Sequence, residues 1–545
     1  MQSLNNSASQ NLSVARIAAL LLLMVCGSLT IQGQTNFGRI SGTVKDTNGG
    51  ALPNANVIIT DLAKNLVRTA TTDSDGFYTV TNLPVGAYSV AAERTGFKRA
   101  SQSGIAVTAD ARLTVDVTLE PGQVTETVQI STIAGETVNT TSGEVARVVD
   151  KRQVQNLALN GRNYMQLVTL IPGAAILDEN QLALTTSLSI SQASINGNRP
   201  NYNSLSVDGG FNMDSGSNNS QVNNVGVDFI EEVKIQTSNF SAEYGRNAGA
   251  SVNIVTRGGG NSYHGTAFEF LRNDKLDARN FFSPVKAKLR FNNFGWNFNG
   301  PIKKDKFFFF VGQEYKRIRQ DSAPVKRSMP THAERLGDFS FRLRGPDGIV
   351  STADDGVLRN PANAANTCVA PVFNSDGSIK TAAIRTGCFA GNLIPTALLT
   401  TDGRAIASVF STMEKLAAAY SDTPTSNNTI FQQPNPFNWR EDNVRLDYRF
   451  NEKHSIYGRY FHDNYDLIDP YGTFIDSPLP TIPTNRRRPG FSYQISYTWL
   501  IHPTLINEAK VNATWNGQRI PPVGEFWKRD TYGFTYPQLF RRALR

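Results

Sequence analysis

Residues 243–270, EYGRNAGASVNIVTRGGGNSYHGTAFEF, change character at their middle. The first half is a loop rich in glycine and asparagine, followed by a strand pattern in which Val252 and Ile254 share a face. The three glycines of residues 258–260 permit tight turns and a flexible exit. From Tyr263 onward, polar and aromatic residues alternate. The stretch therefore predicts the end of one domain and the start of an extended β-structure.

The composition of the whole chain favours β-structure. Its 545 residues are too many for one core, and they include 43 Gly, 31 Phe and 17 Tyr but only 18% charged residues. The predicted fold class is therefore mainly β, with several folding units. The formal net charge of +8 is dispersed and not gathered in a dense Lys/Arg cluster, so nucleic acid is not a predicted partner.

Residues 1–33 have the features of a secretory signal peptide. Arg16 precedes the apolar run IAALLLLMVC, whose 10 residues are too few to span a bilayer as a helix. Small residues near Gly33 suit a cleavage site, so we expect an exported mature chain that starts near Gln34. Lipidation of Cys26 is the less favoured alternative, because the preceding Val25 is bulky for such a site.

Two cysteines remain after this cleavage, Cys368 and Cys388, both in a stretch rich in Gly, Asn and Thr. An isolated pair in an oxidising compartment most often forms a disulfide, and we predict one here. The alternative is two free thiols.

Residues 37–122 alternate short strand patterns with turn sequences. In the segment ARLTVDVTL the apolar residues occupy every second position and share one face. The turn sequences NGG, SDG and LPVG supply residues that tolerate or preset the required dihedrals. Asp73 and Asp75 look like the start of a calcium loop, but no Glu follows at the twelfth position, which favours a tight turn.

The segments GTVKDTNGGALPNANVIITD and TDSDGFYTVTNLPVGAYSVAAERTGFK resemble the carboxypeptidase regulatory-like domain. The resemblance implies a transthyretin-like β-sandwich over residues 37–122, in a superfamily classed as carbohydrate-binding-like. Such domains accompany metallocarboxypeptidases, yet no histidine of this chain sits in an H-E-x-x-H or comparable ligand spacing. We therefore predict neither an enzyme nor a metal or cofactor site from the five histidines, which are His264, His332, His454, His462 and His502.

Three further segments resemble, in order, the plug domain of TonB-dependent outer-membrane receptors, in particular the Oar-like group. They are NLALNGRNYMQLVTLIPGA, SINGNRPNYNSLSVDGGFNMDSG and DFIEEVKIQTSNFSAEYGRNAGASVNIVTRGGGNSYHG. The resemblance implies an α+β plug over residues 132–262. The signature positions are Asn160, Gly161, Arg162, Asn163, Asp208, Gly209, Tyr244, Gly245, Gly249 and Asn253.

Other chemistry within the same region is disfavoured. The RGGG run does not match G-x-x-x-x-G-K-[ST] and opens no predicted helix, so a nucleotide site is not expected. Asp208, Glu231 and Glu232 could form an acid–base set, but exposed carboxylates at turns and strand ends are far commoner, and we expect these to be exposed.

Residues 123–131 join the two domains and contain the extended segment VTETVQIS. Such a segment could add as a strand to the sheet of another protein, although an ordinary linker is the alternative. By family resemblance it is the candidate TonB box. The residues that would contact TonB are Glu126, Thr127, Val128, Gln129 and Ile130.

From residue 263 onward, several segments alternate in the manner of outer-membrane strands. In FSYQISYTW, the residues Phe491, Tyr493, Ile495, Tyr497 and Trp499 would face lipid, and the intervening polar residues would face the lumen. NVRLDYRF and FGWNFNG repeat the pattern, which a soluble sandwich could also show. Short turns alternate with long connections, as in membrane barrels. Residues 263–545 are therefore predicted to be the N-terminal part of a barrel.

The longest connection, residues 320–436, is predicted to be an extracellular loop with a helix in GRAIASVFSTMEKLAAAY, residues 403–420. We place about seven strands after the plug, whereas a plugged transporter needs about 22. The sequence thus predicts a truncated or split barrel.

The functional expectation is a TonB-dependent receptor that takes up a solute across the outer membrane. Its partners would be TonB, outer-membrane lipid and a solute such as an iron chelate, an oligosaccharide or a peptide. The alternative is a non-transporting cell-surface protein that binds carbohydrate or other proteins.

Overall fold

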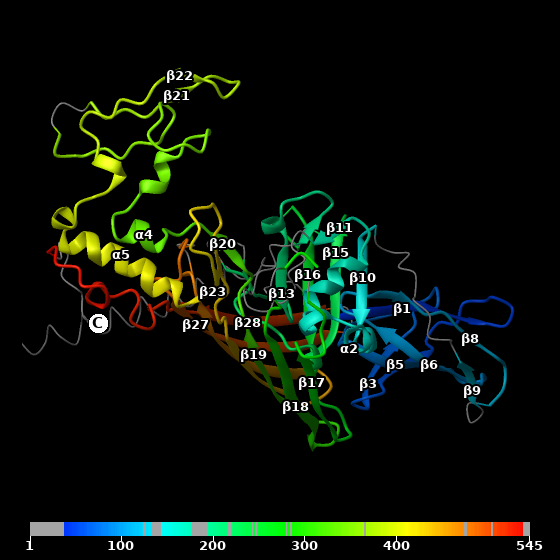
Figure 1. Ribbon diagram of the computed structural model, residues 1–545. Coiled ribbons are helices and arrows are strands. Elements are labelled where there is room, and N and C mark those ends of the chain that lie inside the picture. The colour runs from blue at the N-terminus through cyan, green and yellow to red at the C-terminus, as the bar shows by residue number, and fades with distance from the viewer. Residues whose placement is uncertain are drawn as a thin grey trace, which may run out of the picture.

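The computed structural model describes residues 37–123, 127–131, 143–176, 193–214, 220–241, 244–245, 248–279, 281–283, 286–363, 367–473, 477–502 and 505–537. The expected signal peptide therefore lies outside the described residues. An N-terminal β-sandwich lies at one end of the molecule and a long-loop region at the other, with a middle domain and a long curved sheet between them (Figure 1). The fold is mainly β, as predicted.

The sandwich consists of two sheets, with strand orders β4-β1-β7 (β8 also pairs with β1) and β3-β2-β5-β6-β9. Alternating residues of both sheets, among them Ile40, Val57 and Val90, point inward and form its core. Asp73 closes a tight turn by accepting the backbone N–H of Phe77 at 2.8 Å. The strands are β1 (Gly38–Asp46), β2 (Asn56–Asp61), β3 (Leu66–Thr71), β4 (Phe77–Leu83), β5 (Gly86–Glu93), β6 (Arg99–Val107), β7 (Arg112–Thr114), β8 (Val117–Leu119) and β9 (Thr127–Ser131).

The middle domain is built on a five-stranded sheet of order β10-β15-β16-β13-β14. A capping box between Asp150 and Gln153 starts the short helix α2. The apolar core of the middle domain also includes Phe310 and Phe461 of the long sheet, so the middle domain and the long sheet share one core. The elements are β10 (Val145–Asp150), α2 (Lys151–Asn156), η2 (Asn160–Arg162), η3 (Tyr164–Leu170), β11 (Ala174–Ile176), β12 (Ala193–Ile195), η4 (Pro200–Tyr202), β13 (Ser204–Val207), β14 (Gly210–Phe211), η5 (Val227–Phe229), β15 (Ile230–Ser238) and β16 (Ser251–Thr256).

The long sheet has seven strands in sequential antiparallel order, which agrees with the number placed from the sequence. Among the described residues its first and last strands, β17 and β28, stand at opposite ends of the sheet, so the barrel is not closed. The strands are β17 (His264–Asn273), β18 (Leu289–Lys303), β19 (Phe307–Gln320), β25 (Phe437–Arg449), β26 (His454–Asp469), β27 (Thr484–His502) and β28 (Leu505–Asn516).

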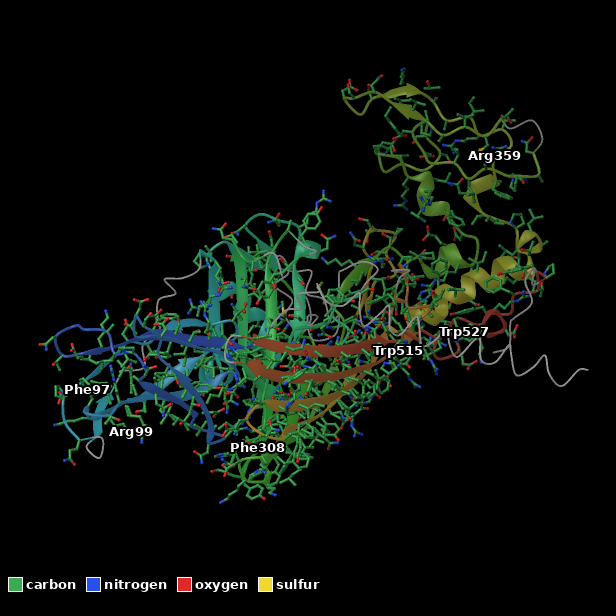
Figure 2. The ribbon with its side chains drawn as sticks, turned by 180° about the vertical axis from the view of Figure 1, so that it is seen from behind. Phe97, Arg99, Phe308, Arg359, Trp515 and Trp527 are labelled. Atoms are coloured by element: carbon green, nitrogen blue, oxygen red, sulfur yellow. A yellow bond between two sulfur atoms is a disulfide. The ribbon has the colours of Figure 1, made fainter. Side chains whose placement is uncertain are left out.

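The two faces of the long sheet differ as the alternation predicts. On β27, Tyr493 and Ile495 are 54% and 55% exposed, whereas Gln494 and Ser496 are each 1% exposed. Other strands of the sheet also carry exposed aromatic side chains, such as Phe294 and Trp296 on β18 and Trp515 on β28, the last of which is labelled in Figure 2. The aromatic rows therefore face outward, which is the arrangement of a lipid-facing surface.

The long loop between β19 and β25 folds into a small region with its own three-stranded sheet, β20-β24-β23. The predicted helix ends earlier than expected, at Glu414, because Ala417–Tyr420 forms β23 and pairs with β24. Strand pairing here overrides the helix propensity of the alanines. None of the described helices has the length and apolarity to span a bilayer. The elements are β20 (Val325–Arg327), α4 (His332–Arg335), η6 (Ser340–Leu343), β21 (Val372–Phe373), β22 (Ile379–Thr381), η7 (Ala390–Asn392), η8 (Thr396–Leu398), α5 (Thr401–Glu414), β23 (Ala417–Tyr420), β24 (Thr429–Phe431) and, after the last long strand, η9 (Arg529–Thr531).

Candidate functional site

A polar surface lines the inner face of the long sheet, where the middle domain lies against it. Its amides, carboxylates and cations are no more than 4% exposed, so protein covers them and not solvent. Buried polar groups of this kind need partners, and the middle domain supplies many of them. The members are Asn293, Asn297, Glu314, Lys316, Glu441, Asn443, Arg459, Asp463 and Gln494.

Asp208 is the most heavily bonded contact between the two bodies. It follows β13 with a φ of 50°, and its carboxylate accepts the backbone N–H of Thr256 at 2.8 Å and the Thr256 hydroxyl at 2.7 Å. From the long sheet, Arg459 Nη1 lies 2.5 Å from Oδ2 and Arg445 Nη1 lies 3.8 Å from Oδ1. Gln494 Nε2 also donates to the Asp208 carbonyl at 2.8 Å. The Asp208 side chain thus joins β13 and β16 to two barrel strands, β25 and β26, and its backbone carbonyl adds a third, β27.

The charge state of Asp208 follows from these partners. Burial alone would raise its pKa, but Arg459, Arg445 and the Thr256 hydrogen bonds together hold the pKa below its usual range. The carboxylate is therefore ionised and paired. The expectation that Asp208 is an exposed turn carboxylate was wrong. The turn position could be predicted from the sequence, but the long sheet that covers the side chain could not.

The NGRN motif forms a second contact. Arg162 Nη2 donates to Asp228 Oδ2 at 2.5 Å, and its guanidinium carbon lies 4.1 Å from the ring centroid of Phe270 on β17. Gly161 has a φ of 64°, which glycine adopts readily, and its carbonyl accepts Lys316 Nζ at 3.3 Å. Asn160 begins η2, and the structure describes the backbone of this residue but not its side chain.

A third contact places backbone N–H groups of the middle domain on barrel carboxylates. The Gly226 N–H donates to Glu441 Oε2 at 2.7 Å. Asp463 accepts from Asn223 Nδ2 at 2.7 Å and from the Asn224 N–H at 3.2 Å. These partners were missed in the sequence because isolated Asn and Gly residues in a loop carry no pattern that points to a distant strand.

The remaining signature residues shape the middle domain internally. Asn253 Oδ1 accepts from Ser206 Oγ at 2.9 Å and from the Gly209 N–H at 3.2 Å, which supports the turn that presents Asp208. Gly209 itself has a φ of 75°. Gly245 is exposed.

Two other signature positions also act within the domain. Asn163 Oδ1 accepts the Met165 N–H at 3.0 Å and caps η3. A Cβ on Gly249 would lie 2.7 Å from the Tyr202 carbonyl oxygen, so only glycine fits there.

The sandwich docks on the middle domain through the loop between β6 and β7. The Ala109 N–H donates to Glu232 Oε1 at 2.6 Å, Lys234 Nζ lies 3.4 Å from Asp110 Oδ2, and the Tyr244 hydroxyl also contacts Asp110. Burial, with help from nearby acids, raises the pKa of Glu232 to about 8 despite the Ala109 hydrogen bond. The expected exposure of Glu232 was therefore wrong.

The neighbouring Glu231 is partly exposed. Its carboxylate lies 3.8 Å from Lys151 Nζ and 3.9 Å from Arg257 Nε. The three carboxylates of the hypothetical acid–base set thus have separate structural roles. Asp208 pairs with the barrel, Glu232 meets the sandwich, and Glu231 forms loose surface pairs.

The candidate TonB segment lies partly outside the described residues, which exclude Glu126. Residues Thr127–Ser131 form β9, which pairs in parallel with β6 at the edge of the sandwich. The backbone places Thr127, Val128, Gln129 and Ile130 opposite residues 99–102. Phe97 and Arg99 lie at the end of the sandwich farthest from the long sheet (Figure 2).

Two features lie in the loop region. A disulfide joins Cys368 to Cys388. Asp347, Asp354 and Asp355 hold their carboxylates within 4.8 Å of one another, but Asp355 is paired with Arg385 at 2.5 Å, and Asp354 accepts the Asp347 N–H at 3.2 Å. Asp347 Oδ1 in turn accepts the Ile349 N–H at 2.8 Å. Because protein donors already engage all three carboxylates, we assign no metal to this group.

Comparison with known proteins agrees with this architecture. Residues 255–543 match the family described as outer membrane beta barrel domain, residues 39–120 the carboxypeptidase regulatory-like domain, and residues 138–252 the TonB-dependent receptor plug domain. The chain is 30% identical over 293 residues to the TonB-dependent transporter Oar of Myxococcus xanthus, an alignment that covers 50% of this chain and 26% of Oar.

Two solved structures are similar to parts of the chain. The outer-membrane transporter YddB from Escherichia coli has 11% identity and a TM-score of 0.37, over 68% of this chain and 38% of YddB. The ferric enterobactin receptor PfeA from Pseudomonas aeruginosa has 14% identity and a TM-score of 0.36, over 68% of this chain and 40% of PfeA. The chain thus spans less than half the length of each of these three relatives.

Proposed function

Because the chain belongs to the outer-membrane β-barrel family of TonB-dependent receptors, we propose that it takes up a solute across the outer membrane with energy relayed by TonB. The protein is located in the outer membrane, and the relatives it matches are transporters and not enzymes. Its solute would be an iron chelate, an oligosaccharide or a peptide. No chemical change in the solute is part of the proposal.

The observation that carries the proposal is the polar contact between the plug (the middle domain) and the barrel. Asp208, Arg162 and Gly226 meet the inner face of the long sheet through ion pairs and hydrogen bonds. Water can replace such contacts when a domain moves, because the net free energy of each hydrogen bond is only about 1 kcal/mol. An interface of this kind suits a plug that holds its place at rest and rearranges under force.

The candidate coupling segment is β9. It is the last strand in the order β3-β2-β5-β6-β9, so within the described residues its outer edge has no strand partner. An edge strand presents a row of backbone N–H and C=O groups, to which a strand of another protein can add. We infer that TonB pairs with this edge, with Glu126 to Ile130 in contact.

The chain order supplies a route for the force. The segment precedes β10, which among the residues that the structure describes is an edge strand of the plug sheet and pairs there only with β15. A pull on β9 would therefore reach β10 first and could unpair it from β15 one residue at a time. Force on an edge strand meets less resistance than force on an internal strand, because only one ladder of hydrogen bonds opposes it.

The test removes one backbone donor of β9 and keeps the rest of the segment. We would replace Val128 with proline, which lacks the backbone N–H, and compare this variant with Val128→Ala as the matched control. Capture of the purified periplasmic part of TonB by the whole chain in detergent micelles, where both faces are accessible, is the first readout. Solute accumulation before and after discharge of the proton gradient is the second.

We expect Val128→Pro to lose TonB capture while Val128→Ala retains it. Unchanged capture in the proline variant would remove β9 as the coupling site. Accumulation that persists after the gradient is discharged would favour the alternative of a binding or adhesion protein, whose ligand capture needs no energy.

A further inference from the structure

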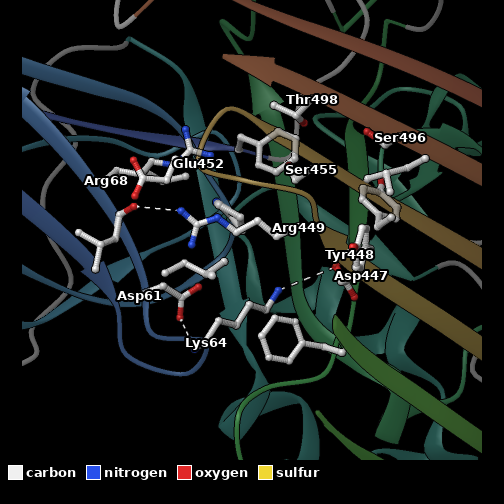
Figure 3. Close-up of a pocket in the computed structure, with 18 of the residues that line it drawn as sticks. Asp61, Lys64, Arg68, Asp447, Tyr448, Arg449, Glu452, Ser455, Ser496 and Thr498 are labelled. Carbon is white, nitrogen blue, oxygen red and sulfur yellow. Dashed lines mark hydrogen bonds and ion pairs between the residues drawn. The ribbon is translucent and has the colours of Figure 1, made fainter. Parts of the chain in front are cut away.

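A cavity lies between the sandwich and the end of the barrel at which a short turn joins β25 to β26. Its volume is about 100 Å³, and its walls come from β2, β3, β4 and β5 of the sandwich and from β19, β25, β26 and β27 of the long sheet. A buried water needs about 10–15 Å³ of such space, so the cavity is large enough for several waters or for one small polyatomic ion. Figure 3 shows charged side chains of both domains on the walls, among them Arg68, Arg449 and Lys64.

Two guanidinium groups face this cavity from different domains. Arg68 belongs to β3 of the sandwich and Arg449 ends β25 of the barrel. Arg449 Nη2 donates to the Val67 carbonyl at 3.3 Å and its Nε to the Asn451 carbonyl at 3.2 Å. Arg68 Nη1 donates to the Thr81 carbonyl at 3.4 Å. Each guanidinium thus has backbone partners that leave other N–H donors available.

The acidic residues around the cavity do not neutralise this pair. Asp447 is engaged by Arg445, at 3.0 Å from Nη2, and by Lys64 Nζ at 3.9 Å. Asp61 Oδ1 accepts the backbone N–H groups of Ala63 and Lys64 at 2.9 and 3.0 Å. Glu452 is exposed in the β25–β26 turn. Within the described residues, no carboxylate lies within ion-pair distance of either Arg68 or Arg449.

The electrostatic environment of Arg68 agrees with this imbalance. Burial and the nearby charge of Arg449 lower the pKa of Arg68, although Tyr88 acts in the opposite direction. Two like charges that face one partly enclosed space repel each other, and an anion between them would relieve that repulsion.

We propose that the cavity binds a tetrahedral oxyanion of the phosphate class between the guanidinium groups of Arg68 and Arg449. The planar fork of arginine matches two oxygens of such a group, and its charge-assisted hydrogen bonds are about twice as strong as neutral ones. One guanidinium comes from the sandwich and the other from the barrel. Binding would therefore stabilise docking of the sandwich on the barrel, by an amount that grows with anion concentration.

The phosphate group could come from a free solute or from a lipid headgroup. The Arg449 side chain lies on the inner face of β25. The Tyr448 side chain, which also lines the cavity, lies on the outer face of the same strand. The site therefore lies close to both the lumen and the lipid boundary. This inference rests on the fold and the charge balance of the cavity, and it does not depend on coupling to TonB.

The test measures binding to the whole chain in a maltoside detergent, which contains no phosphate. One titration uses inorganic phosphate and the other uses short-chain phosphatidylglycerol, each followed by calorimetry. The test variants are Arg68→Gln and Arg449→Gln. The matched controls are Lys45→Gln on the sandwich and Lys453→Gln in the β25–β26 turn, which remove the same charge at exposed positions outside the cavity.

We expect saturable binding of the anion. In each arginine variant the dissociation constant should rise about tenfold or more, because a charge-assisted hydrogen bond to the anion is lost. The lysine controls should bind as the unmodified chain does. Binding of inorganic phosphate would identify a free anion as the source, and binding of the lipid alone would identify the headgroup. If neither probe binds, or if all four variants bind equally, the proposal is overturned.

Arg68→Lys and Arg449→Lys serve as a second pair, in case the glutamine variants fail to fold. They keep the positive charge but lose the planar fork of donors. We expect intermediate weakening for both, and binding indistinguishable from the unmodified chain would count against the proposed geometry.

Discussion

Arg459 on β26 and Asp208 after β13 form an ion pair with an Nη1–Oδ2 distance of 2.5 Å, although 251 positions separate them in the sequence. Both side chains are almost completely buried, and Arg445 approaches the same carboxylate from β25. This ion pair therefore holds the plug to the barrel, and loss of either side chain would leave the other charge buried without a partner.

Replacement of Asp208 with asparagine should loosen this contact strongly. It would leave Arg459 buried without its counter-charge, and removal of one partner of a buried pair costs about 3–5 kcal/mol. Hydrogen exchange of the β13 and β16 amides under increasing denaturant would measure the loss. Glu231→Gln is the control, because its pairs at 3.8 and 3.9 Å are loose and partly exposed, and its effect should stay below about 1 kcal/mol. Equal effects of the two variants would contradict the role assigned to Asp208.

The sequence predicted the architecture better than the contacts, for a physical reason. Alternation in a strand such as β27 reports which face is apolar, and that property belongs to the strand alone. The partners of Asp208 and Glu232 depend on which surface covers them, and this is decided by residues on other domains. The motif containing Asp208 could be located from its resemblance to plug domains, but its burial beneath Arg459 could not.

The long loop shows the same limit on a smaller scale. Residues 403–420 look helical throughout, since alanine and leucine favour helices. Helix α5 ends at Glu414 because residues 417–420 pair with β24. Since β24 lies outside residues 403–420, the composition of this segment could not reveal the pairing.

Gly312 on β19 allows the barrel to approach the plug closely. A Cβ at this position would lie 2.5 Å from a ring carbon of Phe229, which is fully buried and packs edge-on against Phe310. We expect Gly312→Ala to destabilise plug docking by about 1–3 kcal/mol, the usual cost of overpacking. The measurement is the protease sensitivity of the plug in the folded protein.

The matched control for this variant is Gly458→Ala on β26. A Cβ on Gly458 would meet no atom within 4 Å, so the same change of residue carries no steric penalty there. Comparable protease sensitivity in the two variants would show that the close approach of Gly312 and Phe229 does not limit docking.

Docking of the sandwich on the plug should weaken as the pH rises. The pKa of Glu232 is about 8 in the folded protein, above the value of 4.5 for a free side chain, because burial disfavours the charged form. A raised pKa contributes stability that is complete below pH 4.5 and is lost as the pH rises through about 8. Glu231 and Asp150 act in the same direction as burial, whereas Lys234 and the Ala109 N–H oppose it.

Cross-linking between the sandwich and the plug at pH 5 and pH 9 would test this dependence. Glu232→Gln keeps the shape of the side chain and cannot ionise, so its docking should vary less with pH. Should the glutamine variant show the same pH profile as the unmodified chain, another group must be responsible.

The Cys368–Cys388 disulfide should stabilise the outer part of the long loop without affecting the plug. It closes a segment with a sequence separation of 20, which contains the two-stranded sheet of β21 and β22. Chain-entropy estimates give about 3 kcal/mol for a closed loop of this size. In the double variant Cys368→Ser and Cys388→Ser, we therefore expect faster proteolysis between residues 368 and 388 but unchanged protection of β13 and β16. Both positions are replaced so that no single thiol is left to form intermolecular bonds. Equal protease sensitivity of the loop in the two proteins would mean that its other contacts, and not the disulfide, determine its order.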